Sequence, residues 1–374
     1  MKSKAVFSLL ILSALGFGGV RAESIKQEAF AIAIHGGVNG GVVKEGQPAS
    51  CQKDEIQAED GPKVKERLAA ALNRGYAILD AGGDADEAVV AAIEVMEDSP
   101  LFDAGKGSIQ TTSGSIEMDA AIMDGTRKAV GAVAAVTRLK NPIRAAQALM
   151  KAGEDVLMTG VGAEERALAL DSELATESPA YFLEHKGCQD APAKVPPDLA
   201  RHGTVGAVAL DRAGRLVAGT STGGYPGKKP GRIGDSPIIG AGTYADKRVA
   251  MSSSGIGEYF IRHNITHTVA KRMELLGESF DVAVQRTFDG AYADDGLRNV
   301  NIDLRHIQAD APDGEALRAI LARLHALGIG GVIALDAQGQ PHDYFRFSAF
   351  ARGYRRASDQ EPVVRVDGPV DAIR

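Results

Sequence analysis

Apolar positions in the first half of the chain predict short buried strands and amphipathic helices. The stretch AFAIAIHGG, residues 29–37, is apolar and ends in a glycine turn, as is typical of a buried strand. Residues 63–98 place Ala, Leu, Ile and Val on one face of two helices, which AGGD at 81–84 separates with a stop and an N-cap. Two more strands are predicted at 115–125 and 129–139, and a helix that opens with Asn-Pro at 141–153.

The second half of the chain contains two predicted hairpins. VGAVALD and LVAGTSTGG, residues 205–211 and 216–224, flank the turn RAG, and residues 327–348 form the second hairpin. Between them lie a glycine-rich loop at 231–246, a strand at 248–257 and a helix at 258–275. Because strands follow strands and helices follow helices, the pattern favours a layered α+β domain with antiparallel sheets over an alternating parallel α/β sheet.

The first residues are typical of a secretory signal. MKSK is basic, residues 5–20 are apolar, and Ala22 completes a small-residue cleavage pattern. The apolar run is shorter than the roughly 20 residues of a spanning helix, so a cleaved signal peptide at 1–22 is favoured over the alternative, a membrane anchor. We therefore expect the mature chain to begin near Glu23 and to be secreted or periplasmic.

Composition excludes several classes of protein. The chain has 374 residues, 44% of them hydrophobic, which is enough for a sizeable core. A net charge of −7, with Lys and Arg scattered along the sequence, argues against nucleic-acid binding. Cys51 and Cys188 allow one disulfide at most, and neither has the surroundings of a catalytic thiol.

A polar, Pro-rich linker at about 171–203 ends at Gly203 and Thr204, directly before a predicted buried strand. This arrangement suits self-cleavage. If the Thr204 hydroxyl attacks the Gly203 carbonyl, the peptide bond becomes an ester that water can hydrolyse. The product carries a free α-amino group on Thr204, whose reference pKa of about 7.7–8.0 lets it act as a base near neutral pH. One residue would then supply both the nucleophile and its base.

A series of motifs in one order strengthens this interpretation: IHGG, PLFDAGKGS, EMDAAIMDG, HGTVGAVALD, TSTGG, GRIGDSPIIGAG and SSGIGEYFIR. Together they resemble the plant-type L-asparaginase or isoaspartyl peptidase family of N-terminal nucleophile hydrolases, over nearly the whole mature chain. The resemblance implies a four-layer αββα sandwich of two antiparallel sheets flanked by helices. It also implies one precursor that is cut into an α chain, 23–203, and a β chain, 204–374, and a dimer of such pairs.

The resemblance assigns roles to individual residues. Thr204 corresponds to the nucleophile and Thr222 to the threonine that hydrogen-bonds it. Arg232 suits a substrate α-carboxylate, and Asp235 suits the α-ammonium. Ser254 and Gly255 fall where the family has its oxyanion donors. The implied substrate-binding set is Arg232, Ile233, Gly234, Asp235, Ser254, Gly255, Ile256 and Gly257.

Two motifs depart from the family pattern. SGIG replaces the usual TGTG, so Ser254 stands where Thr is usual, but the hydroxyl survives and activity is expected. FDAG replaces a form in which Asn is common, so Asp103 stands in the glycine loop. In the family this loop wraps a sodium ion through backbone carbonyls, and no cofactor is needed for catalysis. The corresponding carbonyls here are those of Met96, Glu97, Ser99, Phe102, Ala104 and Lys106.

The implied activity is hydrolysis of isoaspartyl dipeptides and L-asparagine, which releases L-aspartate. A glycosylasparaginase that cleaves the glycan–asparagine bond is the alternative among enzymes, and a non-catalytic periplasmic binding protein is the alternative of another class. Without the neighbouring motifs, Arg232 and Asp235 would be interpreted as an ion pair within a structural loop, but with Thr204 and Thr222 present substrate binding is favoured. The stretch HNITH puts His263 and His267 at zinc-site spacing, but it lacks the Glu of H-E-x-x-H, and a surface pair is favoured.

Overall fold

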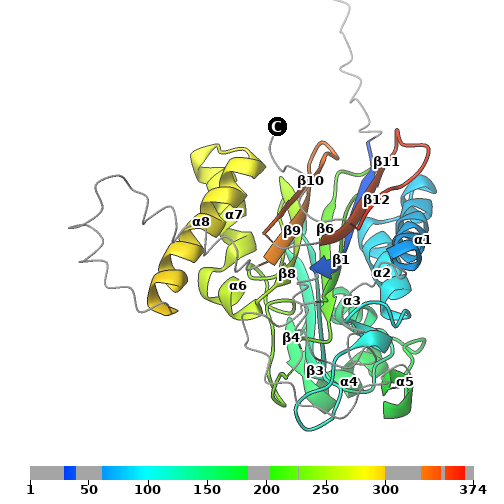
Figure 1. Ribbon diagram of the computed structural model, residues 1–374. Coiled ribbons are helices and arrows are strands. Elements are labelled where there is room, and N and C mark those ends of the chain that lie inside the picture. The colour runs from blue at the N-terminus through cyan, green and yellow to red at the C-terminus, as the bar shows by residue number, and fades with distance from the viewer. Residues whose placement is uncertain are drawn as a thin grey trace, which may run out of the picture.

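The computed structural model describes residues 29–38, 61–183, 203–225, 227–299, 330–346 and 350–366, the last eight of α8 without side chains. Two sheets pack face to face, with helices outside each of them (Figure 1). The predicted signal peptide, both cysteines, and residues 184–202 of the predicted linker lie outside the described residues. The four layers confirm the αββα sandwich.

Within the described residues, the large sheet has eight strands in the order β12-β11-β1-β5-β6-β2-β3-β4. Their bounds are Ala31–Val38 for β1, Met118–Asp124 for β2, Ala129–Val136 for β3, Leu157–Thr159 for β4, Val205–Leu210 for β5, Leu216–Thr222 for β6, Phe350–Arg356 for β11 and Val363–Arg365 for β12. The smaller sheet has the order β10-β9-β8-β7, with β7 at Thr243–Ala245, β8 at Val249–Gly255, β9 at Gly330–Asp336 and β10 at Pro341–Phe345.

Helices α1 (Gly61–Asp80), α2 (Ala85–Glu97) and α3 (Pro142–Ala152) cover the outer face of the large sheet. Helices α6 (Gly257–His263), α7 (Ile265–Leu276) and α8 (Phe280–Asn299) cover the small sheet from the other side (Figure 1). Helix α4 (Gly160–Leu170) packs on α3, and α5 (Pro179–Leu183) lies near the glycine loop. No helix of the described residues is long and apolar enough to cross a membrane.

Strand β5 illustrates why the central strands read as continuous apolar runs. Val205, Ala207 and Ala209 belong to the core beneath α1–α3, whereas Val208 and Leu210 belong to the core on the small-sheet side. Successive side chains of a strand point to opposite faces, and here both faces are covered. Every position of β5 is therefore buried.

Three local predictions were wrong. The helix expected at 258–275 is two helices, because Asn264 adopts a left-handed conformation with φ 48° and ψ 51° between α6 and α7. The sheets are not purely antiparallel, since the short edge strand β4 pairs with β3 in parallel. The predicted linker is not all loop either, because α5 forms where Pro179 can open a helix.

Candidate active site

The strand register brings Thr204 and Thr222 together. β5 and β6 are antiparallel with Val205 opposite Ser221, which places Thr204, one residue before β5, beside Thr222. The Thr204 hydroxyl donates a hydrogen bond to Oγ1 of Thr222 across 3.1 Å. The amide of Gly224 donates to the same oxygen at 3.0 Å, which fixes the Thr222 rotamer. Both threonines are buried, with 4% and 3% of their surface exposed.

The segment TST of β6 distributes its three side chains by the two-residue period of a strand. Thr220 and Thr222 face the small sheet, whereas Ser221 faces the helices and donates to Oε1 of Glu97 at 2.6 Å. Thr220 joins a buried chain of hydrogen bonds between the sheets. It contacts Ser252 of β8 at 2.7 Å, and Ser252 contacts Nε2 of His35 at 2.9 Å.

Ser254 follows Ser252 by two residues on the regular strand β8, so it faces the large sheet as well. It is fully buried, and Gly255 completes the strand opposite Gly330. The Ser254 hydroxyl thus lies on the inner face of the small sheet, the face that contacts β5 and β6, and Gly255 follows it at the end of β8. Ile256, the next residue, is the buried N-cap of α6.

Arg232 and Asp235 converge on Gly257, the first residue of α6. A methyl group at Gly257 would lie 2.9 Å from Nη2 of Arg232 and 3.0 Å from Oδ1 of Asp235. The fold therefore places a guanidinium and a carboxylate side by side where only glycine leaves room. Of the two residues between them in the sequence, Gly234 is buried and Ile233 is half-buried.

Neighbouring side chains fix the position of both Arg232 and Asp235. Glu258 of α6 accepts two hydrogen bonds from Arg232, from Nε and from Nη2, both 3.0 Å long. The ring of Tyr225 lies under the guanidinium, 4.2 Å from ring centre to Cζ. Ser253 donates to Oδ2 of Asp235 at 3.0 Å. Burial outweighs this hydrogen bond and the Arg232 charge, and it raises the pKa of Asp235 to about 6.

Asp119 ties this loop to the threonines. It lies opposite Thr222 in the β2–β6 register, and its Oδ2 accepts the amide of Gly234 at 3.2 Å. Its other oxygen accepts the amide of Ala135 at 2.8 Å. One buried carboxylate on β2 thus links the end of β6, at Thr222, to the loop of Arg232.

Lys228 is a buried cation beside the threonine turn, with 2% of its surface exposed. Its ammonium donates to the carbonyls of Glu117 and Gly223, and its stem fills the space beside Gly224. Burial lowers its pKa, against the charges of Asp103, Asp119 and Glu117. Lys228 therefore locks the turn that follows Thr222.

Comparison with known proteins agrees with this geometry. A family model described as asparaginase matches residues 38–298. Over 347 residues the chain is 34% identical to an isoaspartyl peptidase of Escherichia coli strain K12, which covers 88% of this chain and 93% of that protein. Over 246 residues it is 41% identical to an isoaspartyl peptidase/L-asparaginase of Mus musculus, and this alignment covers 63% of this chain and 73% of the mouse protein. This chain belongs to the asparaginase family.

Several supporting residues of this asparaginase-family site had not been predicted from the sequence. They are His35, Asp119, Lys228, Ser252, Ser253, Glu258 and the side chain of Glu97, a residue that was predicted only as a carbonyl ligand of sodium. GIGE, within the quoted motif SSGIGEYFIR, contains Glu258, whereas Lys228 lies between two of the quoted motifs. His35, Ser252 and Asp119 act through partners on other strands, which no local pattern shows.

The glycine loop that follows α2 folds tightly on itself. A side chain at Gly105 would lie 2.4 Å from the carbonyl oxygen of Glu97, and one at Gly107 would lie 1.8 Å from that of Phe102. The amide of Ser99 donates to the Met96 carbonyl at 3.1 Å, and Gly107 donates to that of Ala104 at 3.2 Å. Carbonyls of the predicted sodium set are thus packed against the loop's own glycines.

The Glu97 side chain itself is an unusual buried acid at the end of α2. Its Oε1 accepts from Ser221 at 2.6 Å and from the amide of Ile143 at 3.1 Å, which joins α2 to β6 and α3. Burial raises its pKa to about 8, against these two hydrogen bonds. The carboxyl group is therefore neutral at pH 7.

We expect Glu97 to make the stability of the fold fall as pH rises. The pKa of Glu97 is about 8 in the folded state, whereas the ordinary pKa of a glutamate is 4.5. The stability that the protonated group contributes is therefore complete below pH 4.5 and is lost as the pH rises towards 8. The slope is about 1.4 kcal/mol per pH unit. Glu97→Gln keeps a neutral side chain of the same shape and should lack this slope. Urea titrations of both proteins from pH 5 to 8 give the free energy of unfolding at each pH. Plots of this free energy against pH that run parallel for the two proteins would refute the role of Glu97.

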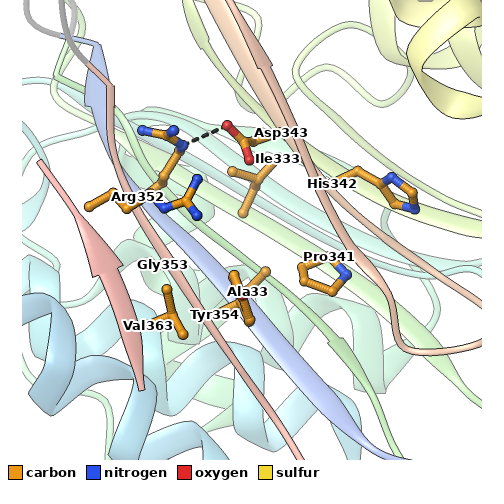
Figure 2. Close-up of a pocket in the computed structure, with 10 residues that line it drawn as sticks. Ala33, Ile333, Pro341, His342, Asp343, Arg352, Gly353, Tyr354 and Val363 are labelled. Carbon is orange, nitrogen blue, oxygen red and sulfur yellow. Dashed lines mark hydrogen bonds and ion pairs between the residues drawn. The ribbon is translucent and has the colours of Figure 1, made fainter. Parts of the chain in front are cut away.

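Two other features lie apart from this site. His263 ends α6 and His267 belongs to α7. Because the helix breaks at Asn264, the two histidines do not lie one turn apart on a single helix, as the spacing of HNITH had suggested. A surface pocket between β1, β10, β11 and β12 is lined by residues that include the ion pair of Arg352 with Asp343, 2.6 Å long (Figure 2). None of the predicted site residues lines that pocket.

Proposed function

We propose that this chain is an amidohydrolase that cleaves isoaspartyl dipeptides and L-asparagine, after it has cut its own Gly203–Thr204 bond. The observation that carries the proposal is the placement of Thr204. It follows Gly203, directly precedes the buried strand β5, and donates a hydrogen bond from its hydroxyl to Thr222. Relatives named isoaspartyl peptidase support the substrate class.

Self-cleavage begins with Thr204 Oγ1, which attacks the carbonyl carbon of Gly203. The C–N bond breaks, the amine takes up the hydroxyl proton, and an ester joins Gly203 to Thr204. Water then hydrolyses the ester and leaves a carboxylate on Gly203 and a free hydroxyl and α-amine on Thr204. Gly37 of β1 lies against this bond, because a side chain there would lie 2.8 Å from Cα of Gly203.

Hydrolysis of substrate uses the same hydroxyl. The Thr204 amine takes the hydroxyl proton, and Oγ1 attacks the side-chain amide carbonyl of the substrate. Ser254 and the amide of Gly255 would stabilise the oxyanion. The amide C–N bond breaks, the amine's proton goes to the departing ammonia or peptide, and water hydrolyses the acyl-enzyme to release aspartate.

Arg232 and Asp235 would hold the substrate's backbone. An amino acid presents an α-carboxylate and an α-ammonium about one carbon apart, which matches a guanidinium and a carboxylate that meet at Gly257. Glu258 occupies one edge of Arg232 and leaves the remaining N–H groups to face a ligand.

The substrate class is tested with three amides on the purified, cleaved protein. These are an isoaspartyl dipeptide, L-asparagine and a glycan-linked asparagine, with aspartate release as the readout. We expect release from the first two. Release from the glycan-linked substrate alone would support a glycosylasparaginase instead. An uncut chain that binds these ligands without turnover would support a binding protein.

The buried Asp235 predicts how substrate affinity depends on pH. Protonation near pH 6 would remove the partner of the α-ammonium, so KM for asparagine should rise as pH falls below 6, by about tenfold per pH unit. KM above pH 7 should be flat. Asp235→Asn should show a raised KM without this dependence between pH 5 and 7. A wild-type KM that stays constant down to pH 5 would remove Asp235 from recognition.

We further propose that the glycine loop holds a sodium ion through the carbonyls of Met96, Glu97, Ser99, Phe102, Ala104 and Lys106. Backbone oxygens suit a hard cation, and the loop brings several of these carbonyls close to its own glycines. The ion would stiffen the loop that carries Asp103. Thermal unfolding in sodium chloride against choline chloride tests this, and equal melting temperatures would contradict it.

The location and assembly of the protein are also proposals. A signal peptide at 1–22 would direct it to the periplasm or outside the cell, and secreted protein should then begin near Glu23. Two αβ pairs would form a dimer. Leu157 of the edge strand β4 and its neighbours Val156 and Val161 expose apolar surface, the kind of surface that an interface covers. Cell fractionation with N-terminal sequencing tests the location, and a protein that keeps its full-length N-terminus would overturn it. Light scattering tests the assembly, and a single αβ pair in solution would overturn the dimer.

A further inference from the structure

Tyr225 lies on the turn that connects the end of β6 to the loop of Arg232. It follows Thr222 closely in the sequence, and its carbonyl accepts the amide of Lys228 at 3.1 Å. The amide of Arg232 donates in turn to the carbonyl of Lys229 at 3.0 Å. These two turns bring the half-buried ring of Tyr225 under Arg232, with 4.2 Å between the ring centre and Cζ.

The guanidinium of Arg232 has neighbours on several sides. Glu258 accepts from Nε and Nη2 along one edge, with two hydrogen bonds of 3.0 Å. A methyl group at Gly234 would lie 3.0 Å from Nη1, and one at Gly257 would lie 2.9 Å from Nη2. Only 13% of the Arg232 side chain is exposed. Among the described residues, no hydrogen-bond partner occupies the edge between Nη1 and Nη2, so this edge is the one that a ligand can use.

The ring of Tyr225 restrains the guanidinium in a direction that its hydrogen bonds do not. The N–H groups of a guanidinium lie in its plane, so Glu258 holds one edge and still allows the group to tilt about that edge. A cation over an aromatic face, within about 6 Å of the ring centre, is attracted by the ring quadrupole, and the attraction is stronger where water is excluded. The mostly buried Arg232 meets both conditions.

We propose that Tyr225 is a positioning residue for substrate recognition, whose ring holds the Arg232 guanidinium in the orientation that receives the α-carboxylate of the substrate. The inference rests on the proposed function, because it needs Arg232 as the partner of that carboxylate. A guanidinium that is already oriented loses less conformational freedom when the ligand binds. Because the ring acts through Arg232, its removal should raise KM and leave kcat nearly unchanged.

The test is steady-state kinetics with L-asparagine on the cleaved variants Tyr225→Phe and Tyr225→Leu. Phe keeps the aromatic face, so its KM should stay within about twofold of the wild-type value. Leu keeps apolar bulk without a quadrupole, and its KM should rise about three- to tenfold at a nearly unchanged kcat. An unchanged KM in Tyr225→Leu, or a Phe variant as impaired as the Leu variant, overturns the inference.

Tyr76 offers a matched control for the loss of a ring beneath an arginine. The centre of its ring lies 3.9 Å from Cζ of Arg355, between α1 and β11 and thus on the outer face of the large sheet. Tyr76→Leu removes a contact of the same kind away from the loop of Arg232. Its KM should equal that of the wild type, and a rise as large as in Tyr225→Leu would overturn the inference.

A double-mutant cycle separates this role from a merely structural one. If Tyr225 acts through Arg232, Tyr225→Leu should leave KM unchanged in a protein that already carries Arg232→Ala. A rise of KM in that background, as large as the rise in the wild-type background, would show that the ring acts independently of Arg232 and would overturn the inference.

A second series keeps the shape of the side chain, so folding is not at issue. Phenylalanines with one, two and three ring fluorines at position 225 weaken the negative face of the ring step by step, and KM should rise with each fluorine. A constant KM across this series overturns the inference, while cleavage and turnover leave the proposed function standing. A wild-type protein without turnover would overturn both.

Discussion

Replacing Thr204 by Ala is expected to abolish both chain cleavage and hydrolysis and to leave one folded precursor. The hydroxyl is the proposed nucleophile in both reactions, and its loss removes the attacking atom and not merely a contact. The variant should still fold, because among the described residues Thr204 makes one side-chain hydrogen bond, to Thr222, and it precedes a strand whose own residues are all buried. Gel electrophoresis and ammonia release from asparagine measure the two outcomes.

Matched variants separate chemistry from packing at this position. Thr204→Ser keeps the hydroxyl and loses only the methyl that restricts its rotamer, so it should cleave and hydrolyse slowly. Thr204→Cys should cleave but hydrolyse amides poorly. Thr287→Ala removes another buried threonine, one that donates to a carbonyl within α8, and should leave both reactions unchanged. A Thr204→Ala protein that still releases ammonia would remove Thr204 from the mechanism.

Replacing Arg232 by Ala is expected to raise KM for asparagine roughly ten- to hundredfold, since a hydrogen bond to a charged group contributes about 1.5–3 kcal/mol. Cleavage of the precursor should be largely intact, because it involves no substrate carboxylate. The fold should tolerate the change, since the Glu258 side chain that loses its partner is 42% exposed. Steady-state kinetics on the cleaved variant give KM and kcat separately.

Arg272 offers a matched control for this substitution. It forms the same two-bond pair with a carboxylate, that of Glu278, but on the outer helix layer. Arg272→Ala should leave KM unchanged. Equal kinetics in Arg232→Ala and Arg272→Ala would make Arg232 a structural residue and would leave the α-carboxylate without its proposed partner.

Much of the fold follows from local pattern, and the exceptions have physical causes. The apolar runs of β1, β5 and β6 and the amphipathic faces of α1 and α2 are predictable, because burial on one or both faces fixes their residue types. The C-terminal strands β11 and β12 were not predicted, since the three arginines of ARGYRR in β11 break the apolar pattern of a buried strand although the strand is paired on both sides. The end of α6 was missed because Asn264 breaks the helix without Gly or Pro.

Part of the candidate site could also be predicted from local sequence, and part could not. Thr204, Thr222, Arg232 and Asp235 lie in contiguous motifs, so residue type and spacing could identify them. Their mutual placement required the register of β5 with β6 and the approach of α6 to the loop. The groups that hold them come from β2, α6 and the glycine loop, and only the three-dimensional structure brings these segments together.

The central claim is that a threonine freed by self-cleavage is the nucleophile, and N-terminal sequencing of the purified protein tests it most directly. The account predicts two chains of similar size, the smaller of which begins Thr-Val-Gly-Ala, the sequence from residue 204. A single uncut chain with full activity, or a second chain that begins at any other residue, would contradict it.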